Sequence, residues 1–176
     1  MHFADPKANI LQMGMREGMK VGDFGVGSGH YAIAAAGIVG RDGKVYAVDV
    51  QEDVLKHVRH MAERAHRMNI DTVWGDIEKP GGTKLRDQSL DAVILSNVLF
   101  QLAQVDRALA EAKRTLKSGG KLLVVDWAGS YGGMGPAPEH VVQEHKAEEW
   151  VLAAGFHKQK GFRAGPHHYG LVFTAP

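Results

Sequence analysis

The stretch that most constrains the fold runs from Val21 to Tyr31 and reads V-G-D-F-G-V-G-S-G-H-Y. It holds an acid and three glycines at alternate positions, and an alanine-rich segment that favours a helix follows it. A short apolar strand, a glycine-rich turn and a helix make up the first half of a nucleotide-binding βαβ unit. Glycines in such a turn let the backbone bend sharply and let a ligand lie against main-chain N–H groups. We therefore expect an α/β fold with a ligand site at this turn.

The spacing of the glycines distinguishes two classes of ligand. A dinucleotide-binding turn has the pattern G-x-G-x-x-G, and counted from Gly25 its third glycine would stand at His30. The sequence instead reads D-x-G-x-G-x-G, beginning at Asp23. This pattern argues against an NAD-dependent oxidoreductase, which is kept as an alternative. Because a glycine-rich turn can also be a plain strand-to-helix connection, the assignment depends on motifs further along the chain.

Length and composition predict a single domain over residues 1–176, with residues 1–18 as a short N-terminal cap segment. Hydrophobic residues make up 44% and charged residues 23%, as in globular chains. A formal net charge of +1 gives no strong nucleic-acid signal. The absence of cysteine excludes disulfides, thiolate metal sites and a cysteine nucleophile. The sequence shows neither a signal pattern nor an apolar stretch long enough to be a membrane segment, so we expect a cytoplasmic protein of unknown oligomeric state.

The second apolar run, Lys44–Val50, reads as a buried parallel strand and contains Asp49 near its end. Asp49 stands twenty residues after Gly29, where an acid can accept hydrogen bonds from the ribose hydroxyls of an adenosine. The alternative is that Asp49, or Asp53, caps the next helix. That helix is predicted over residues 51–68, with an apolar stripe formed by Val54, Val58, Met61, Ala65 and Met68. His57 and His60 lie on its other side without a recognised metal spacing, so no metal site is expected.

Three further apolar runs predict strands over residues 70–77, 90–97 and 121–127. The carboxyl end of a central strand is where open α/β sheets bind ligands, which places Asn97 at the site. Residues 78–89 contain proline and glycine, so the crossover there should be short or irregular. Helices are predicted over residues 102–116, ending in a glycine cap at Gly119, and over about 138–154. Residues 156–162 and 169–174 can form a final antiparallel pair.

The order and spacing of these motifs over residues 19–127 resemble class I S-adenosylmethionine-dependent methyltransferases, especially those of ubiquinone and menaquinone biosynthesis and other small-molecule enzymes. The phrase L-K-S-G-G-K-L-L-V-V-D is similar to the L-K-P-G-G-x-L-x-x-x-[DE] segment of that family. The resemblance implies one doubly wound Rossmann-like domain. Its seven-stranded, mostly parallel sheet should have the order 3-2-1-4-5-7-6, with helices on both faces. Gly22 departs from the family pattern, where a branched apolar residue is usual.

The resemblance also implies S-adenosyl-L-methionine as the cofactor. In the family, an acid after the third strand meets the adenine amino group and the next residue covers the ring; Asp76 and Ile77 match these positions, although Asp76 could also be a plain turn residue. The cofactor-binding residues implied in this way are Asp23, Phe24, Gly25, Gly27, Gly29, Asp49, Val50, Gly75, Asp76, Ile77 and Asn97.

The implied reaction is methyl transfer by direct in-line displacement to an unidentified acceptor, for which we expect a small molecule. Asn97 is not followed by the Pro-Pro-aromatic motif of nucleobase amino methylation, and arsenite methylation would need cysteines. The catalytic candidates are Asn97, Asp126 and His140, although a structural role is open for each. His167 and His168 are further candidates for a base, which is needed only if the acceptor must lose a proton. The alternative function is a non-catalytic, cofactor-binding partner subunit.

The segment from Ala128 to Pro138 reads as a mobile loop, because it contains four glycines and two prolines. It directly follows the fifth predicted strand, so it should overhang the site. Tyr131 and Met134 could then cover an apolar ligand, which would make the loop a lid. The alternative is a connector without a role.

Overall fold

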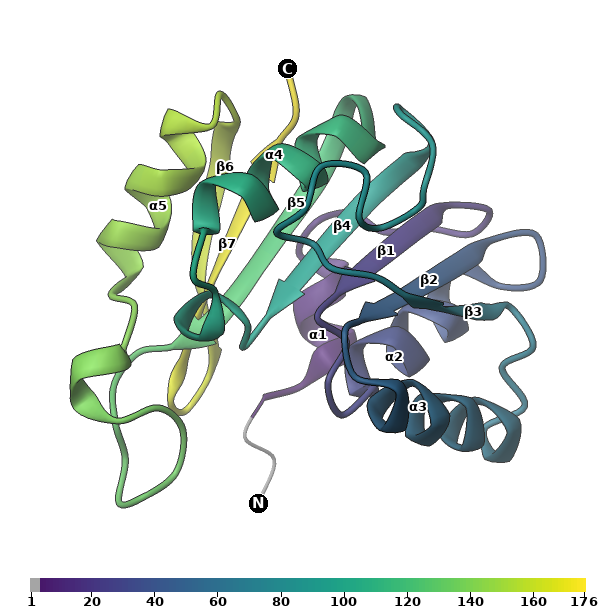
Figure 1. Cartoon of the computed structure of the whole chain (residues 1–176), viewed down its shortest axis with the longest axis horizontal. Helices are drawn as coiled ribbons and strands as arrows, with labels where there is room; N and C mark the ends of the chain where they lie inside the picture. Colours follow the sequence, from purple (N-terminus) through teal and green to yellow (C-terminus); the bar gives the residue numbers. More distant parts are fainter. Residues whose placement is uncertain (1–3) are drawn as a thin grey trace.

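Seven strands form one sheet in the order β3-β2-β1-β4-β5-β7-β6, as the sequence predicted (Figure 1). A computed structural model describes residues 4–176. The strands are β1 (Lys20–Phe24), β2 (Lys44–Asp49), β3 (Ile70–Trp74), β4 (Leu90–Ser96), β5 (Leu116–Trp127), β6 (His157–Gly165) and β7 (His168–Thr174). The first five strands are parallel, and β7 pairs antiparallel with both β5 and β6. Because β7 runs against its neighbours, its first residues lie at the carboxyl edge of the parallel strands.

The helices divide between the two faces of the sheet, and each set covers its own core (Figure 1). On one face lie α1 (Pro6–Leu11), α2 (His30–Val39) and α3 (Glu52–Arg64). On the other lie α4 (Val105–Thr115) and α5 (Glu144–Ala153), with the short 3₁₀ turns η1 (Leu99–Gln101) and η2 (Pro138–His140) between them and the preceding strands. Strand side chains alternate between the two cores: Ile94 packs with α2, whereas Val93 and Leu95 pack with α4.

Gly22 has a packing reason for departing from the family pattern. A Cβ atom at this position would lie 2.5 Å from Cε1 of Phe24 and 2.9 Å from Cδ1 of Leu90. Both neighbours are fully buried, so neither side chain can move aside easily. Phe24 and Leu90 therefore fill the space that a side chain at position 22 would need.

Helix α3 ends at Arg64, earlier than predicted, and its buried face differs from the predicted stripe. The buried residues are Leu55, Val58 and Ala62, whereas Met68 lies beyond the helix and is 83% exposed. The predicted stripe contains Val54 and Met61, whereas the buried face is centred on their neighbours Leu55 and Ala62. The prediction is therefore displaced by about one residue around the helix. Met68 is exposed because the helix that would have turned its side chain toward the core ends four residues earlier.

Three further helix predictions need correction. The helix predicted over 138–154 is two pieces, η2 and α5, separated by residues 141–143. The helix predicted from 102 begins at Val105, after η1. Gly119 has a left-handed φ of +75°, but it lies past the C-cap residue Leu116 and pairs through its N–H with the carbonyl of Ala175, 3.1 Å away. It therefore lies within β5 and is not a helix cap.

Candidate functional site

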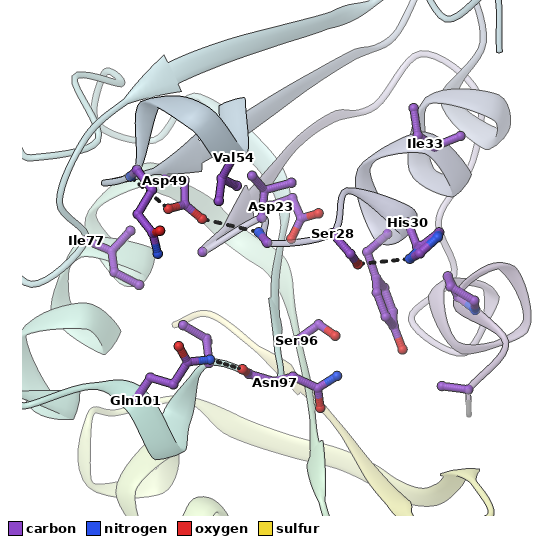
Figure 2. Close-up of a pocket in the computed structure, with 18 of the residues that line it drawn as sticks. Asp23, Ser28, His30, Ile33, Asp49, Val54, Ile77, Ser96, Asn97 and Gln101 are labelled. Atoms are coloured by element: carbon purple, nitrogen blue, oxygen red, sulfur yellow. Dashed lines mark hydrogen bonds between the residues drawn. The ribbon is translucent and has the colours of Figure 1, made fainter. Parts of the chain in front are cut away.

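A cavity of about 990 Å³ opens at the carboxyl edge of the parallel strands, where the sequence places the ligand site (Figure 2). Its walls come from the ends of β1, β2, β4 and β5, the start of β7, the first turn of α2 and the segment after β3. Residues from all of the predicted cofactor motifs line it, namely Asp23, Gly25, Gly27, Asp49, Val50, Gly75, Asp76, Ile77 and Asn97. The structure thus brings together residues that are up to 74 positions apart in the sequence.

The glycine-rich turn needs its glycines for two different reasons. Gly25, Gly27 and Gly29 all have positive φ values, of 74°, 48° and 80°. A Cβ at Gly25 would lie 2.6 Å from Val98, and one at Gly29 would lie 3.0 Å from Val58, so these two allow close packing. Gly27 is exposed to the cavity, and its Cβ would meet only the carbonyl of Gly25, at 3.8 Å. Gly27 is therefore the position where a ligand can approach the backbone.

Asp49 sits where β2 ends and joins the turn to the next helix. Its Oδ2 accepts a hydrogen bond of 3.2 Å from the N–H of Gly27, and its Oδ1 accepts one of 3.0 Å from the N–H of Gln51 (Figure 2). A carboxylate has about four lone-pair sites, so two remain for a ligand. Gln51 is the N-cap residue of α3, so Asp49 supports the helix start and lines the cavity at once. Asp53, the other predicted capping residue, is exposed and pairs with Lys56 at 2.9 Å.

Asp23 is 1% exposed and projects into the same cavity from β1. Burial raises the pKa of its carboxyl group to about 8; the backbone N–H of Ala32 lowers the pKa, and the negative charge of Asp49 raises it slightly further. Its Oδ2 atom is buried and has no hydrogen-bond partner among residues 4–176. A buried acceptor without a partner is costly, and a cationic or hydrogen-bonding ligand group would satisfy it.

The far end of the cavity is formed by the segment that follows β3. Val50 is 55% exposed and Ile77 is 6% exposed, and both present apolar surface to the cavity. Oδ1 of Asp76 accepts a hydrogen bond of 3.0 Å from the N–H of Glu78, so its carboxylate is held at the rim. Glycine at position 75 lets the backbone of residue 82 approach closely, since a Cβ at Gly75 would lie 2.4 Å from the carbonyl oxygen of Gly82. This end suits a flat ring with polar edges.

The centre of the cavity is lined by Ser96 and Asn97, at the end of β4. Asn97 has a left-handed φ of 55°, a conformation that asparagine tolerates better than most residues. Its N–H donates to the carbonyl of Val125 at 2.8 Å, and its own carbonyl accepts from Nε2 of Gln101 at 2.8 Å (Figure 2). The side-chain Oδ1 is buried without a partner among the described residues. Asn97 therefore offers a second unsatisfied acceptor close to Ser96.

Phe24, Asp126 and His140 lie outside the cavity, although the sequence pointed to them as site residues. Phe24 is fully buried in the core under α4, so only its backbone is near the site. His140 is an exposed residue of η2. Asp126 is 1% exposed and accepts hydrogen bonds from the N–H groups of Leu99, at 3.1 Å, and Trp127, at 2.8 Å. Burial raises the pKa of the Asp126 carboxyl group to about 7.

Strand alternation explains which of these residues reach the cavity. In β5, Leu123 and Val125 face the core under α2, and Trp127 continues that row, whereas Asp126 follows Leu122 and Val124 to the other face. The cavity lies on the α2 side, so Trp127 lines it and Asp126 does not. The lining residues that sequence reasoning missed include Tyr31, Ser96, Gln101 and Trp127. Counting alternate positions from the apolar core could have found Ser96 and Trp127.

The sheet order, the glycine-rich turn and a cavity lined by acidic strand ends define a Rossmann-like protein built to bind an adenosine-containing ligand. A family model described as "Methyltransferase domain" matches residues 22–124, more than half of the chain. The chain therefore belongs to the methyltransferase domain family, and its fold is that of the class I S-adenosylmethionine-dependent methyltransferases. S-adenosyl-L-methionine is the cofactor of these proteins, as the sequence predicted.

Individual relatives agree with the family. The chain is 32% identical over 129 residues to a ubiquinone/menaquinone biosynthesis C-methyltransferase UbiE of Pseudomonas entomophila, covering 73% of this chain and 49% of that protein. It is 37% identical over 122 residues to an arsenite methyltransferase of Aquipseudomonas alcaligenes, covering 66% and 35%. A crystal structure of a SAM-dependent methyltransferase from Aquifex aeolicus matches with a TM-score of 0.90 and 27% identity, covering 99% and 91%. The chain spans about half the length or less of these curated relatives.

Residues 4–176 contain neither a metal-binding cluster nor a membrane-spanning helix. No group of three or more histidine, aspartate or glutamate side chains there is arranged to hold a metal ion. Nor does any helix in that range have the length and apolar character needed to cross a bilayer.

Proposed function

We propose that this protein transfers the methyl group of S-adenosyl-L-methionine to a small-molecule acceptor by direct in-line displacement. The observation that carries the proposal is the shape and chemistry of one cavity. Asp23, Gly27 and Asp49 line it on one side and Ile77 on another, and the buried acceptors of Asp23 and Asn97 face it without partners among the described residues. These groups fit S-adenosyl-L-methionine, which is an adenosine joined to methionine through a positively charged sulfur.

The residues divide into roles along the cavity. Asp49 would accept hydrogen bonds from the ribose hydroxyls with the two lone-pair sites that Gly27 and Gln51 leave free. Val50 and Ile77 would cover the two faces of the adenine ring, and Asp76 would meet its amino group. Asp23 would hold the ammonium group of the methionine part, which would stabilise the ionised form of its carboxyl group. Asn97 would lie closest to the methyl group.

The chain's contribution to the reaction is alignment and exclusion of water. The cofactor supplies a methyl group on a positively charged sulfur, and the sulfur leaves as a neutral thioether that needs no proton. Holding the acceptor atom in line with that methyl group can account for much of the rate, because the reaction becomes effectively unimolecular. The buried walls formed by Val98 and Tyr31 keep water from the reacting atoms.

The acceptor that the relatives favour is a reduced quinone. The names of the UbiE relatives and of a demethylmenaquinone methyltransferase from Bacillus mycoides, 29% identical over 126 residues, both refer to quinones. Trp127 supports an aromatic acceptor, because its half-buried indole lines the cavity beyond Asn97. Arsenite is less favoured despite the arsenite methyltransferase relative, since this chain has no cysteine to bind arsenic.

The test is to incubate the protein with radiolabelled S-adenosylmethionine and either 1,4-naphthohydroquinone, catechol or fractionated cell extract. Label in a small aromatic product supports the proposal, and label in RNA or protein fractions would replace the acceptor class. Cofactor binding without label in any fraction would favour the alternative, a non-catalytic partner subunit. The variant Asp49→Ala serves as the control that lacks the ribose contact.

A further inference from the structure

His168 enters the site through the antiparallel pairing of β7. It is the first residue of β7 and lies opposite Trp127, the last residue of β5. The two rings are in contact, with their centroids 4.3 Å apart at an angle of 42°. His168 is 3% exposed and lines the cavity. It lies outside residues 22–124, the range that the family model matches, so the family pattern assigns it no role.

The pleat of the sheet directs His168 to the same face as the cofactor residues. In β7, Val172 packs in the core under α2, and Gly170 and His168 continue its row, whereas Tyr169 and Leu171 face α4 and α5. On β4 the corresponding row is Ile94 and Ser96, and Ser96 is level with Val125 of β5. His168 therefore faces the same space as Ser96 and Trp127.

Asn97, Trp127 and His168 line the cavity from three neighbouring strands. The order β4-β5-β7 puts two strand intervals between the backbones of Asn97 and His168, a span of about 9–10 Å. Trp127, on the strand between them, offers an indole against which a planar acceptor ring can stack. The acceptor atom next to Asn97 and a hydroxyl group next to His168 can then belong to one molecule.

We propose that His168 is the proton acceptor of the reaction and that the acceptor is an aromatic ring carrying a hydroxyl group. This rests on the proposed function. The imidazole takes the hydroxyl proton, and the electron pair of that O–H bond moves into the ring. The ring then forms a bond to the methyl carbon as the carbon–sulfur bond breaks, and its electron pair stays on the now neutral sulfur. If the oxygen is methylated, His168 passes the proton to solvent. If a ring carbon is methylated, the hydrogen that this carbon carried leaves as a proton and the oxygen takes a proton back, so one proton is released in either case.

Other titratable groups lie on the elements around His168, and several of them have partners elsewhere. They are Asp23 on β1, His30 and Tyr31 on α2, Asp126 on β5, and His167 and Tyr169 beside it. Asp126 and Tyr169 project to the other face, where the Tyr169 hydroxyl donates to the carbonyl of Val142 at 3.0 Å. The Tyr31 hydroxyl accepts a hydrogen bond of 2.8 Å from Asn9, and His167 stacks on Tyr131 at 4.0 Å. Asp5 and Lys7 line the cavity from the N-terminal segment.

A pH profile tests the proposal, with 1,4-naphthohydroquinone as the acceptor and His168→Gln as the variant. At pH 7 the variant's kcat/KM should fall by about 10²–10⁴-fold, the usual contribution of a general base. The deficit should shrink about tenfold for each pH unit toward pH 9, because the phenolic hydroxyl, with a pKa near about 10, then ionises without help. Affinity for S-adenosylhomocysteine should stay unchanged. His157→Gln, an exposed histidine at the start of β6, is the matched control and should behave as wild type. A profile for His168→Gln that runs parallel to wild type, within about threefold, overturns the proposal.

A measurement without turnover separates this proposal from the proposed function. Histidine-selective NMR of the wild-type complex with S-adenosylhomocysteine should show the His168 ring signals, assigned by their loss in His168→Gln. Phenol, catechol or 1,4-naphthohydroquinone should shift those signals and leave the His157 signals in place. If no acceptor is methylated but the shift occurs, the proposed function fails while the hydroxyl-binding role of His168 stands. If none of the three compounds shifts the His168 signals, the proposal is overturned, whatever the activity.

Discussion

At the scale of single residues, we predict that the Asp49 carboxylate contributes directly to ligand affinity. Asp49→Ala should weaken binding of S-adenosylhomocysteine by about 1.5–3 kcal/mol, the scale of hydrogen bonds to a charged group. The variant loses the ligand contacts and also the bond that holds Gly27 in place. Isothermal titration calorimetry measures the loss, with Asp53→Ala, an exposed acid in the first turn of α3, as the control. Unchanged affinity would show that the ribose assignment is wrong, and an unfolded variant by circular dichroism would show that Asp49 is structural.

The raised pKa of the Asp23 carboxyl group predicts that the free energy of unfolding of the ligand-free protein depends on pH. Its pKa is raised to about 8, from an ordinary value of 3.8, so the folded state holds the proton more tightly than the unfolded state. The unfolded state loses this proton above about pH 4, and folding then grows less favourable as pH rises, until the folded state also ionises near pH 8. The slope per group is at most about 1.4 kcal/mol per pH unit.

The variant Asp23→Asn should therefore gain in stability relative to wild type as pH increases from 5 to 8. Urea unfolding at these two pH values measures the difference. Asp126→Asn is a useful comparison, because the pKa of Asp126 is raised to about 7 and its effect has the same sign but ends about one pH unit earlier. A difference between wild type and Asp23→Asn that does not change with pH would contradict the raised pKa.

At the scale of elements, Glu111 on α4 anchors the irregular crossover that follows β3. Its carboxylate accepts hydrogen bonds from the N–H of Gly81, at 3.0 Å, and from the N–H and hydroxyl of Thr83, at 3.1 and 2.6 Å. Arg114 donates to the same carboxylate at 2.8 and 2.7 Å. Although Glu111 is 2% exposed, these donors hold the pKa of its carboxyl group down at about 2. The anchored segment leads on from Asp76 and Ile77, so α4 helps to hold the end of the cavity where we propose that adenine binds.

Replacing Glu111 by Ala should destabilise the fold by about 3–5 kcal/mol, since it leaves the buried donors unpaired. Because the pKa of Glu111 is lowered, its contribution is complete above about pH 4.5 and is lost as pH falls toward 2. Urea unfolding at pH 7 measures the first effect, and wild-type unfolding between pH 5 and 3 should show the second. Glu148→Ala, which removes a salt bridge of 2.6 Å at a partly exposed site, should cost less than about 1 kcal/mol. A similar small loss for both variants would contradict the anchoring role.

A lid role for the loop over residues 128–138 stays a prediction. Tyr131 and Met134 are joined by backbone hydrogen bonds, and Gly135 lies so close to Trp127 that a Cβ would be 2.6 Å from the indole. The loop thus touches a residue that lines the cavity, while Tyr131 and Met134 themselves lie outside it. We expect it to be more mobile than the sheet until cofactor and acceptor are both bound.

Replacing both Tyr131 and Met134 by Ala should reduce methyl transfer much more than affinity for the cofactor. Calorimetry with S-adenosylhomocysteine and turnover of the labelled acceptor measure the two effects side by side. Met68→Ala, at an exposed site distant in sequence, is the control. Unchanged turnover in the double variant would support a plain connector and place the acceptor site elsewhere.

At the scale of the whole molecule, ligand binding should stabilise the complete sheet. The cavity draws on five strands and three α-helices, so a ligand that binds only the folded state raises the free energy of unfolding of all of them together. At a concentration 100 times its Kd, S-adenosylhomocysteine should add about 2.7 kcal/mol. Thermal unfolding with and without ligand measures this, and NAD at the same concentration should give no shift. A larger shift with NAD would contradict the assignment of the cofactor.

Local patterns in the sequence determined most of the fold and the cofactor half of the site. The strands are near-continuous apolar runs because parallel strands are buried on both faces, and a run such as Leu90–Ser96 is visible without any structure. Asp49 and Gly27 were predictable because strand ends and glycine-rich turns have a set geometry within one βαβ unit. Helix bounds were less certain, because the end of α3 and the break before α5 depend on which side chains find a core to pack against.

The part of the cavity that we propose for the acceptor was decided only by tertiary structure. Whether Asp126 or Trp127 reaches the cavity depends on which face of β5 meets α2, and that is a matter of packing between distant elements. His168 is brought beside Trp127 by the antiparallel register of β5 and β7, which joins residues 41 positions apart. Local sequence carries no direct record of that register, because it arises from the pairing of two strands and the helices that cover them.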